Sequence, residues 1–206
     1  MEACPDRSMP RRRAAAVAVA EPSADAALRA DGQAGRRVLV ESPPGTLQQV
    51  LLTTDGSVGR ILEVYADEPI EVEKLEQHSA ASGDPEPALE LAADDQRLWR
   101  RVILHGGRTR RSFIYAEVLA ALERLHPTVR SGLLETPAPI GKLLTTVRAE
   151  TLREVLTAGR EPAGPVGAHF GIREDEELFT RTYRIVSGGR PMMLISEKFP
   201  TTWFLE

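Results

Sequence analysis

Apolar residues near the start of the folded region recur every three or four positions, which is the spacing of amphipathic helices. Thr46 and Gln49 have the spacing of a capping box at the start of the first helix. The apolar stripe of that helix consists of Leu47, Val50 and Leu51. After a break at 54–57, a second stripe consists of Val58, Ile61, Leu62 and Tyr65. The pattern predicts two short helices between residues 46 and 65.

From residue 98 onwards, the pattern changes to runs rich in β-branched and aromatic residues, which are typical of strands. The runs 98–104 and 112–118 flank a turn at Gly106 and Gly107, so they predict a hairpin. Further strands are predicted at 69–77, 148–156, 178–186 and 191–199, a helical patch at 119–125, and a loop or short irregular helix at 79–95. Helices mostly early and strands mostly late favour an antiparallel α+β domain over an alternating parallel one.

Residues 1–42 differ in composition from the rest of the chain. Arg11, Arg12 and Arg13 precede an alanine-rich stretch at 14–20. A positive cluster before a short apolar run is loosely similar to a secretory signal, but alanine is too weakly hydrophobic for such a segment. We therefore interpret residues 1–42 as a disordered leader or an upstream-annotated start, and we place the folded domain at 43–206.

Composition excludes several classes of protein. A chain of 206 residues with 42% hydrophobic residues suits one domain, and no apolar run approaches the length of a membrane span. A net charge of −4 argues against a nucleic-acid partner. The single cysteine, Cys4, excludes a disulfide framework and favours a reducing, cytoplasmic location. The four histidines have no metal-ligand spacing, so no metal is expected; they are His78, His105, His126 and His169.

The last predicted hairpin carries a carboxylate on an apolar row. Gly188 and Gly189 suit a two-residue turn, which would place Arg184 opposite Met193. Glu197 then shares the period-two row of Met193, Ile195 and Phe199. A carboxylate there needs a partner, and Arg184 on the same face is the expected one. In the functional interpretation, Glu197 is a proton-transfer group. The alternatives are that it forms a structural ion pair or lies on a solvent-exposed face of the sheet.

A second charged pair interrupts the predicted strand at 98–104. Arg100 and Arg101 are adjacent, so whichever face is buried receives one of them. An inward arginine requires an anion, because a guanidinium binds a carboxylate with two parallel hydrogen bonds. If the strand lies at an edge, both side chains can instead extend outward into solvent.

An ordered set of segments resembles the chorismate pyruvate-lyase (4-hydroxybenzoate synthase) family, more closely its actinobacterial type than the ubiquinone-pathway enzymes. The matching segments, in single-letter code, are TDGSV followed by ILE, WRRVIL, YAE, LLET with PIGKL, RTYR, and SGGRPMMLISEKFP. They span about residues 43–200, which is nearly the whole predicted domain.

The resemblance implies one antiparallel sheet with helices packed over it and a ligand held beneath the helices. It implies that Arg100, or Arg101 after a one-residue slip, is the catalytic and substrate-binding arginine. It also implies ligand contacts at Ile140 with Gly141, and an acidic catalytic and binding residue at Glu197. From the residues themselves, we expect Arg184 to support the site. Whether a further arginine acts there, Arg148 or Arg153, is left open.

The implied activity converts chorismate to 4-hydroxybenzoate and pyruvate without a cofactor. The alternative is a small-molecule effector-sensing domain of the same architecture without turnover, such as occurs in bacterial transcription regulators. A relative that acts on a modified chorismate is a third possibility, because the motifs do not specify ring substituents. Oligomeric state and downstream pathway are not predicted.

Overall fold

A single six-stranded antiparallel sheet forms the centre of the protein. The computed structural model describes residues 44–204, so the predicted leader at 1–42 lies outside the described residues. The strand order is β1-β2-β3-β6-β5-β4. The strands are β1 (Ile70–Ala80), β2 (Arg97–Gly106), β3 (Ser112–Ala121), β4 (Leu152–Pro162), β5 (Glu177–Ser187) and β6 (Arg190–Pro200). The expected α+β class with one antiparallel sheet is confirmed.

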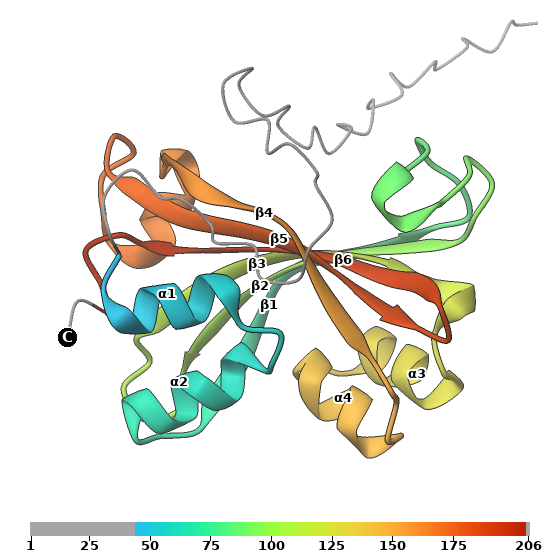
Figure 1. Cartoon of the computed structure of the whole chain (residues 1–206), viewed down its shortest axis with the longest axis horizontal. Coiled ribbons are helices and arrows are strands. Elements are labelled where there is room, and N and C mark those ends of the chain that lie inside the picture. Colours follow the sequence, from blue (N-terminus) through green and yellow to red (C-terminus); the bar gives the residue numbers. More distant parts are fainter. Residues whose placement is uncertain (1–43, 205–206) are drawn as a thin grey trace, which may run out of the picture. The chain divides into compact units, whose positions relative to one another are not determined.

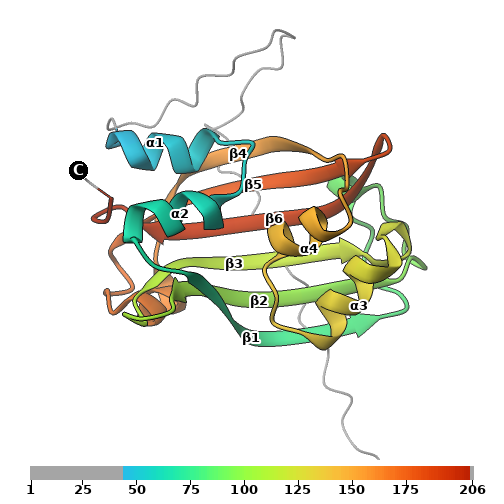
Figure 2. The same ribbon diagram turned by 90° about the horizontal axis from the view of Figure 1, so that it is seen from below.

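Four short α-helices cover one face of this sheet (Figures 1 and 2). They are α1 (Thr46–Thr53), α2 (Val58–Ala66), α3 (Pro127–Glu135) and α4 (Ile140–Thr146). The pair α1 and α2 lies over one end of the strands, and the pair α3 and α4 lies over the other end (Figure 2). Among residues 44–204, no helix is long and apolar enough to span a bilayer.

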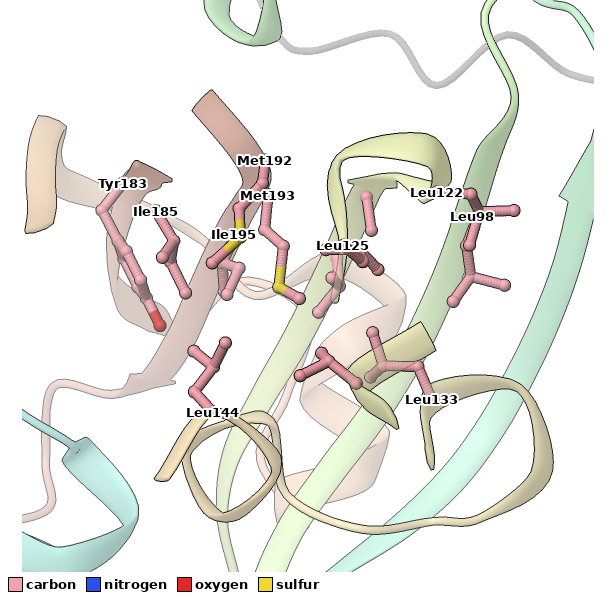
Figure 3. Close-up of a cluster of buried hydrophobic side chains, with 13 residues drawn as sticks. Leu98, Leu122, Leu125, Leu133, Leu144, Tyr183, Ile185, Met192, Met193 and Ile195 are labelled. Atoms are coloured by element: carbon pink, nitrogen blue, oxygen red, sulfur yellow. The ribbon is translucent and has the colours of Figure 1, made fainter. Parts of the chain in front are cut away.

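Each helix pair packs on its own part of the hydrophobic core. Under α3 and α4, Leu133 and Leu144 point at the sheet residues Ile185, Met193 and Ile195 (Figure 3). Under α1 and α2, a second cluster includes Leu51, Leu62, Val102, Phe179, Phe199 and Phe204. Burying one such side chain contributes about 2 kcal/mol. The two clusters leave a stretch of sheet between them that neither helix pair fills.

Within residues 44–204, the opposite face of the sheet is covered only at its ends, by short segments around η1 (Pro87–Leu89) and η3 (Gly164–Phe170) (Figure 1). Small apolar clusters lie beneath them, one with Ile103, Phe170 and Leu178, and one with Leu89, Leu91 and Leu194. Between these clusters, charged side chains pair with one another across the strands.

The two N-terminal helices are confirmed, although the predicted cap of the first was wrong by one residue. Gly45, not Thr46, precedes the first turn, and its N–H donates to the Gln48 side chain at 2.9 Å. Leu51 and Leu52 are buried, whereas Val50 is exposed. The stripe therefore lies one residue further along.

Helix α3 was not predicted, although its start carries recognisable signals. Pro127 occupies the first turn, and the side chain of His126 accepts a hydrogen bond from Thr128 N–H at 3.2 Å. Val129 and Leu133 bury one face with i, i+4 spacing. The predicted helical patch at 119–125 is instead the end of β3 followed by the short η2 (Leu122–Arg124).

The predicted strand at 148–156 begins four residues later, at Leu152. Helix α4 ends at Thr146, and Arg148 has a left-handed backbone with a φ of 50°, which a strand cannot contain. The hairpin turn at Gly188 and Gly189 is confirmed, because both residues have positive φ angles of 57° and 76°.

The register of the last hairpin differs from the prediction by one residue. The pairing runs from Val186 opposite Pro191 directly to Ile185 opposite Met193, so Met192 is an extra residue on β6. Side chains alternate between the two faces of a strand. For every β5 residue from Ile185 back toward the start of the strand, this bulge therefore reverses which residues share a face with Glu197. Arg184 lies opposite Leu194 instead of Met193, and Arg181 lies opposite Glu197.

Candidate active site

A cavity of about 90 Å³ lies between the two helix pairs, above the middle of the sheet. Its floor consists of small and branched apolar side chains, namely Val72, Val102, Leu104, Ala116, Val118, Ile185 and Ile195. Residues 56–59 at the start of α2 form one wall, and residues 138–141 at the start of α4 form the other. The charged residues in the lining are Arg100, Arg153 and Glu197.

Arg100 is the buried positive charge of this cavity. It is only 2% exposed, and its Nε and Nη1 groups have no hydrogen-bond partner in the part of the chain that the structure describes. Burial lowers the pKa of the Arg100 guanidinium, because desolvation disfavours its charged form. Leaving two buried donors unsatisfied is costly, so the arrangement suits an incoming anion with two acceptor atoms.

Arg101 faces the opposite side of the sheet and is already paired. Its guanidinium lies 3.1 Å from the Glu117 carboxylate and 3.3 Å from that of Glu76, and it stacks over the Trp99 ring at 4.2 Å. Of the two adjacent arginines, Arg100 is therefore the one that the structure brings to the cavity.

Glu197 enters the cavity from β6 with its carboxylate held by two donors. It accepts a hydrogen bond from Arg181 Nε at 2.8 Å and from the Tyr183 hydroxyl at 3.0 Å, and it is 6% exposed. Burial, together with the neighbouring Glu197 carboxylate, raises the pKa of Tyr183 above its ordinary value, so its hydroxyl remains a donor. The carboxylate therefore has a defined orientation in the cavity.

The expected pairing of Arg184 with Glu197 is wrong. Arg184 lies on the opposite face, where its Nε donates to Glu154 at 2.5 Å and its Nη1 to the carbonyl of Ala88 at 3.2 Å. It does not line the cavity. The physical reason is the bulge at Met192, which turns Arg184 away from the row of Glu197.

Arg181 occupies the place that the sequence pattern assigned to Arg184. It is 1% exposed, pairs with Glu197, and donates through Nη1 to the carbonyl of Thr54 at 3.0 Å. It thereby links the Glu197 carboxylate to the loop between α1 and α2. Sequence reasoning missed Arg181 because only the position of the bulge decides which arginine faces inward.

Ile140 and Gly141 lie where the start of α4 meets the start of α2. A side-chain carbon added at Gly141 would lie 3.1 Å from Ser57 Oγ, so the close approach of the two helices favours glycine there. The first N–H groups of a helix have no partner within it, and both helix starts line the cavity. Main-chain donors are therefore available on both walls.

Of the two arginines left open, Arg153 lines the cavity and Arg148 does not. Arg153 projects from β4, and its Nη1 donates to the carbonyl of Asp55 at 3.1 Å, in the loop before α2.

The charges in and around the cavity are unequal, because the three arginines Arg100, Arg153 and Arg181 outnumber the single carboxylate of Glu197. The site is thus locally positive in a chain whose net charge is −4.

Comparison with known families shows which family the chain belongs to. A family model described as "Chorismate pyruvate-lyase Rv2949c-like" matches residues 52–205, which include every charged residue of the cavity. The chain belongs to this family. The family assignment expected from the sequence motifs is thereby confirmed.

Individual relatives are similar over most of the chain. The chorismate pyruvate-lyase of Mycobacterium tuberculosis (strain CDC 1551 / Oshkosh) is 28% identical over 156 residues, covering 73% of this chain and 78% of the relative. The Mycobacterium leprae (strain TN) enzyme of the same name is 28% identical over 152 residues, covering 73% and 72%. A putative lyase of Methanocaldococcus jannaschii is 27% identical over 157 residues, covering 74% and 77%.

Solved structures with the same fold include ligand-binding domains of transcription regulators. The effector domain of PhnF from Mycobacterium smegmatis superposes with a TM-score of 0.57 at 11% identity, covering 72% of this chain and 90% of that one. The ligand-binding domain of a putative GntR-family regulator from Bordetella bronchiseptica gives 0.53 at 17% identity, covering 65% and 86%. At such identities the likeness concerns the fold alone.

Proposed function

We propose that this protein is a chorismate pyruvate-lyase that converts chorismate to 4-hydroxybenzoate and pyruvate. The observation that carries the proposal is the pair of unsatisfied guanidinium N–H groups of Arg100, buried in a cavity whose other charged end is the oriented carboxylate of Glu197. An apolar floor between two opposite charges suits a flat ring with an anionic and a hydroxyl substituent.

The register of the strands sets the distance between these two charged ends. Arg100 lies opposite Val118 of β3, and Glu197 lies opposite Ala116 of the same strand, two residues along. The two residues are thus two strands and two positions apart, which corresponds to about 12 Å between their Cα atoms. The side chains of Arg100 and Glu197 span part of this distance, and the ring of the ligand spans the rest. The carboxylate and the hydroxyl are therefore expected at opposite (para) positions of the ring.

Chorismate also carries a second carboxylate, on its enolpyruvyl side chain. Arg153 and the first turn of α2 also line the cavity, and both supply positive charge to it. We assign the enolpyruvyl carboxylate to this wall, and the ring is steadied by the main chain at Ile140 and Gly141. Arg184, which pairs with Glu154 on the other face, has no part in this assignment.

The chemistry is an elimination that makes the ring aromatic. The bond between ring C3 and the ether oxygen breaks, the ring loses its proton at C4, and the departing enolpyruvate gains a proton at its methylene carbon to become pyruvate. In our assignment, Arg100 binds the ring carboxylate, and Glu197 accepts the hydrogen bond of the C4 hydroxyl and assists removal of the adjacent proton. Because the reaction is redox-neutral, it consumes no oxidant or reductant.

The direct test is turnover of chorismate by the purified protein. Pyruvate and 4-hydroxybenzoate should form in equal amounts in the presence of a chelator, and Glu197→Gln should slow the formation of both by about a hundredfold. No products from a folded protein would overturn the proposal.

A second candidate function is ligand sensing without turnover. It is favoured by the fold shared with the regulator domains named above, which are described as an effector domain and a ligand-binding domain. Saturable binding of 4-hydroxybenzoate or chorismate, with both molecules recovered unchanged after long incubation, would support this candidate over the lyase.

A further inference from the structure

Gln77 is the cross-strand neighbour of Arg100. It lies on the edge strand β1, and the register pairs the two residues directly. Directly opposed residues of an antiparallel pair project from the same face with Cβ atoms about 5 Å apart. Gln77 therefore shares the helix-covered face with Arg100, although it does not line the cavity itself.

The amide of Gln77 is only half satisfied. Its Nε2 donates to the carbonyl of Leu134 at 3.2 Å, in the last turn of α3. Its Oε1 is buried and has no hydrogen-bond partner among residues 44–204, and the same holds for Nε and Nη1 of Arg100. A buried acceptor and two buried donors, all unsatisfied, thus belong to adjacent residues, and each is costly to leave so.

We propose that Gln77 is the positioning residue of the anion-binding arginine. Its Oε1 accepts one N–H of Arg100 when an anion occupies the cavity, and this orients the remaining N–H groups toward the carboxylate. An amide oxygen suits this role because it holds the guanidinium without neutralising its charge. The inference rests on the proposed function of Arg100 in binding the ring carboxylate.

This role gives the two charged ends of the cavity similar supports. Arg181 links Glu197 to the carbonyl of Thr54, beside α1 and α2. Gln77 would link Arg100 to the carbonyl of Leu134, and so to α3. Each ligand-contacting group is then attached, through one strand residue, to one of the helix pairs that enclose the ligand.

The test compares two ligands that differ only in the carboxylate: 4-hydroxybenzoate and the uncharged 4-hydroxybenzamide. In the wild type, binding by calorimetry should favour the carboxylate, and Arg100→Ala should remove that preference. Gln77→Leu should reduce the preference by about tenfold, as expected for loss of a hydrogen bond to a charged group, while affinity for the amide changes little. Gln77→Glu should abolish the preference, because its carboxylate competes for Arg100.

Gln48→Leu is the matched control. Gln48 is also a buried glutamine whose amide donates to main-chain carbonyls, those of Thr201 and Trp203, and it lies on α1 away from the cavity. This variant should lose thermal stability and keep the wild-type preference for the carboxylate.

Three outcomes separate the possibilities. An unchanged preference in both Gln77 variants, with the wild type binding 4-hydroxybenzoate, would overturn the positioning role and leave the proposed function intact. A loss of 4-hydroxybenzoate affinity on adding Gln77→Leu to Arg100→Ala that is as large as the loss in the wild-type background would also overturn it, because the effect would not pass through Arg100. A wild type that binds neither 4-hydroxybenzoate nor chorismate would overturn the proposed function first.

Discussion

Two arginines three residues apart on β5 form ion pairs on opposite faces of the same sheet. On the helix-covered face, Arg181 and Glu197 lie 2.8 Å apart, and their side chains are 1% and 8% exposed. On the other face, Arg184 and Glu154 lie 2.5 Å apart, and their side chains are 29% and 38% exposed. Judged by distance alone, the second pair would be the stronger.

Burial, not distance, separates the two pairs. Water screens the charges of Arg184 and Glu154, and either partner can be solvated when the other is removed. Arg181 and Glu197 are almost fully buried, so removing one leaves the other charged in a poorly polar environment. The same contrast holds for Arg100 and Arg101, where the inward residue has unsatisfied donors and the outward one is paired with two acids.

The largest effect is expected from Arg100. Arg100→Ala should lower kcat/KM for chorismate by about a thousandfold, because the cavity loses its buried donors to the ring carboxylate. Arg101→Ala, the adjacent control on the other face, should stay within about threefold of the wild type. Steady-state rates of pyruvate formation measure both. Equal losses in the two variants would break the distinction between the faces.

Removal of Arg181 tests the buried pair itself. Arg181→Met should lower the free energy of unfolding by about 3–5 kcal/mol, because Glu197 is left buried without its cation. Arg184→Met should cost about 1 kcal/mol or less. Urea denaturation of the two variants gives both values. If Arg181→Met/Glu197→Leu is not more stable than Arg181→Met, the cost does not come from an unpaired Glu197.

The carboxylate of Glu197 is expected to act on the rate more than on binding. Glu197→Gln should lower kcat by about a hundredfold and change KM only a few fold, since an amide keeps the shape and cannot take a proton. Glu154→Gln, on the other face, should leave kcat unchanged. A kcat loss confined to Glu154→Gln would place the chemistry on the face opposite the helices and contradict the role of Glu197.

The smallest effect concerns Glu68, a buried carboxylate outside the cavity. Its Oε1 accepts from the Thr109 hydroxyl at 2.6 Å, and its Oε2 accepts the main-chain N–H groups of Arg108 and Thr109. These hydrogen bonds, the Thr109 hydroxyl first, lower the pKa of Glu68 below its ordinary value of 4.5. The stabilisation is therefore fully present above that value and is lost as the pH falls through the lowered pKa.

Glu68→Gln should accordingly lower the urea midpoint at pH 7 and matter less in acid. Glu71→Gln is the control, because the Glu71 carboxylate is exposed and its ion pair with Arg110, at 3.2 Å, lies on the surface. A Glu68→Gln difference that stays constant down to pH 3 would show that its charge does not contribute.

Most of the elements could be predicted from the sequence because their signals are local. Strand runs, the glycine hairpin at Gly188 and Gly189, and the apolar stripe of α2 each depend on neighbouring residues. The errors arose where a local signal was weak or ambiguous. Helix α3 has few apolar residues, and the start of β4 depends on the left-handed Arg148 that follows α4.

The sequence by itself determined the family, the α+β class and the presence of an acid and several arginines on two neighbouring hairpins. Only the tertiary structure decided which of those side chains meet. A strand has a side-chain period of two, so one extra residue at Met192 exchanged Arg184 for Arg181 as the partner of Glu197. The pairing of Gln77 with Arg100 likewise depends on the register between β1 and β2, including the bulge between Lys74 and Glu76, which no local pattern encodes.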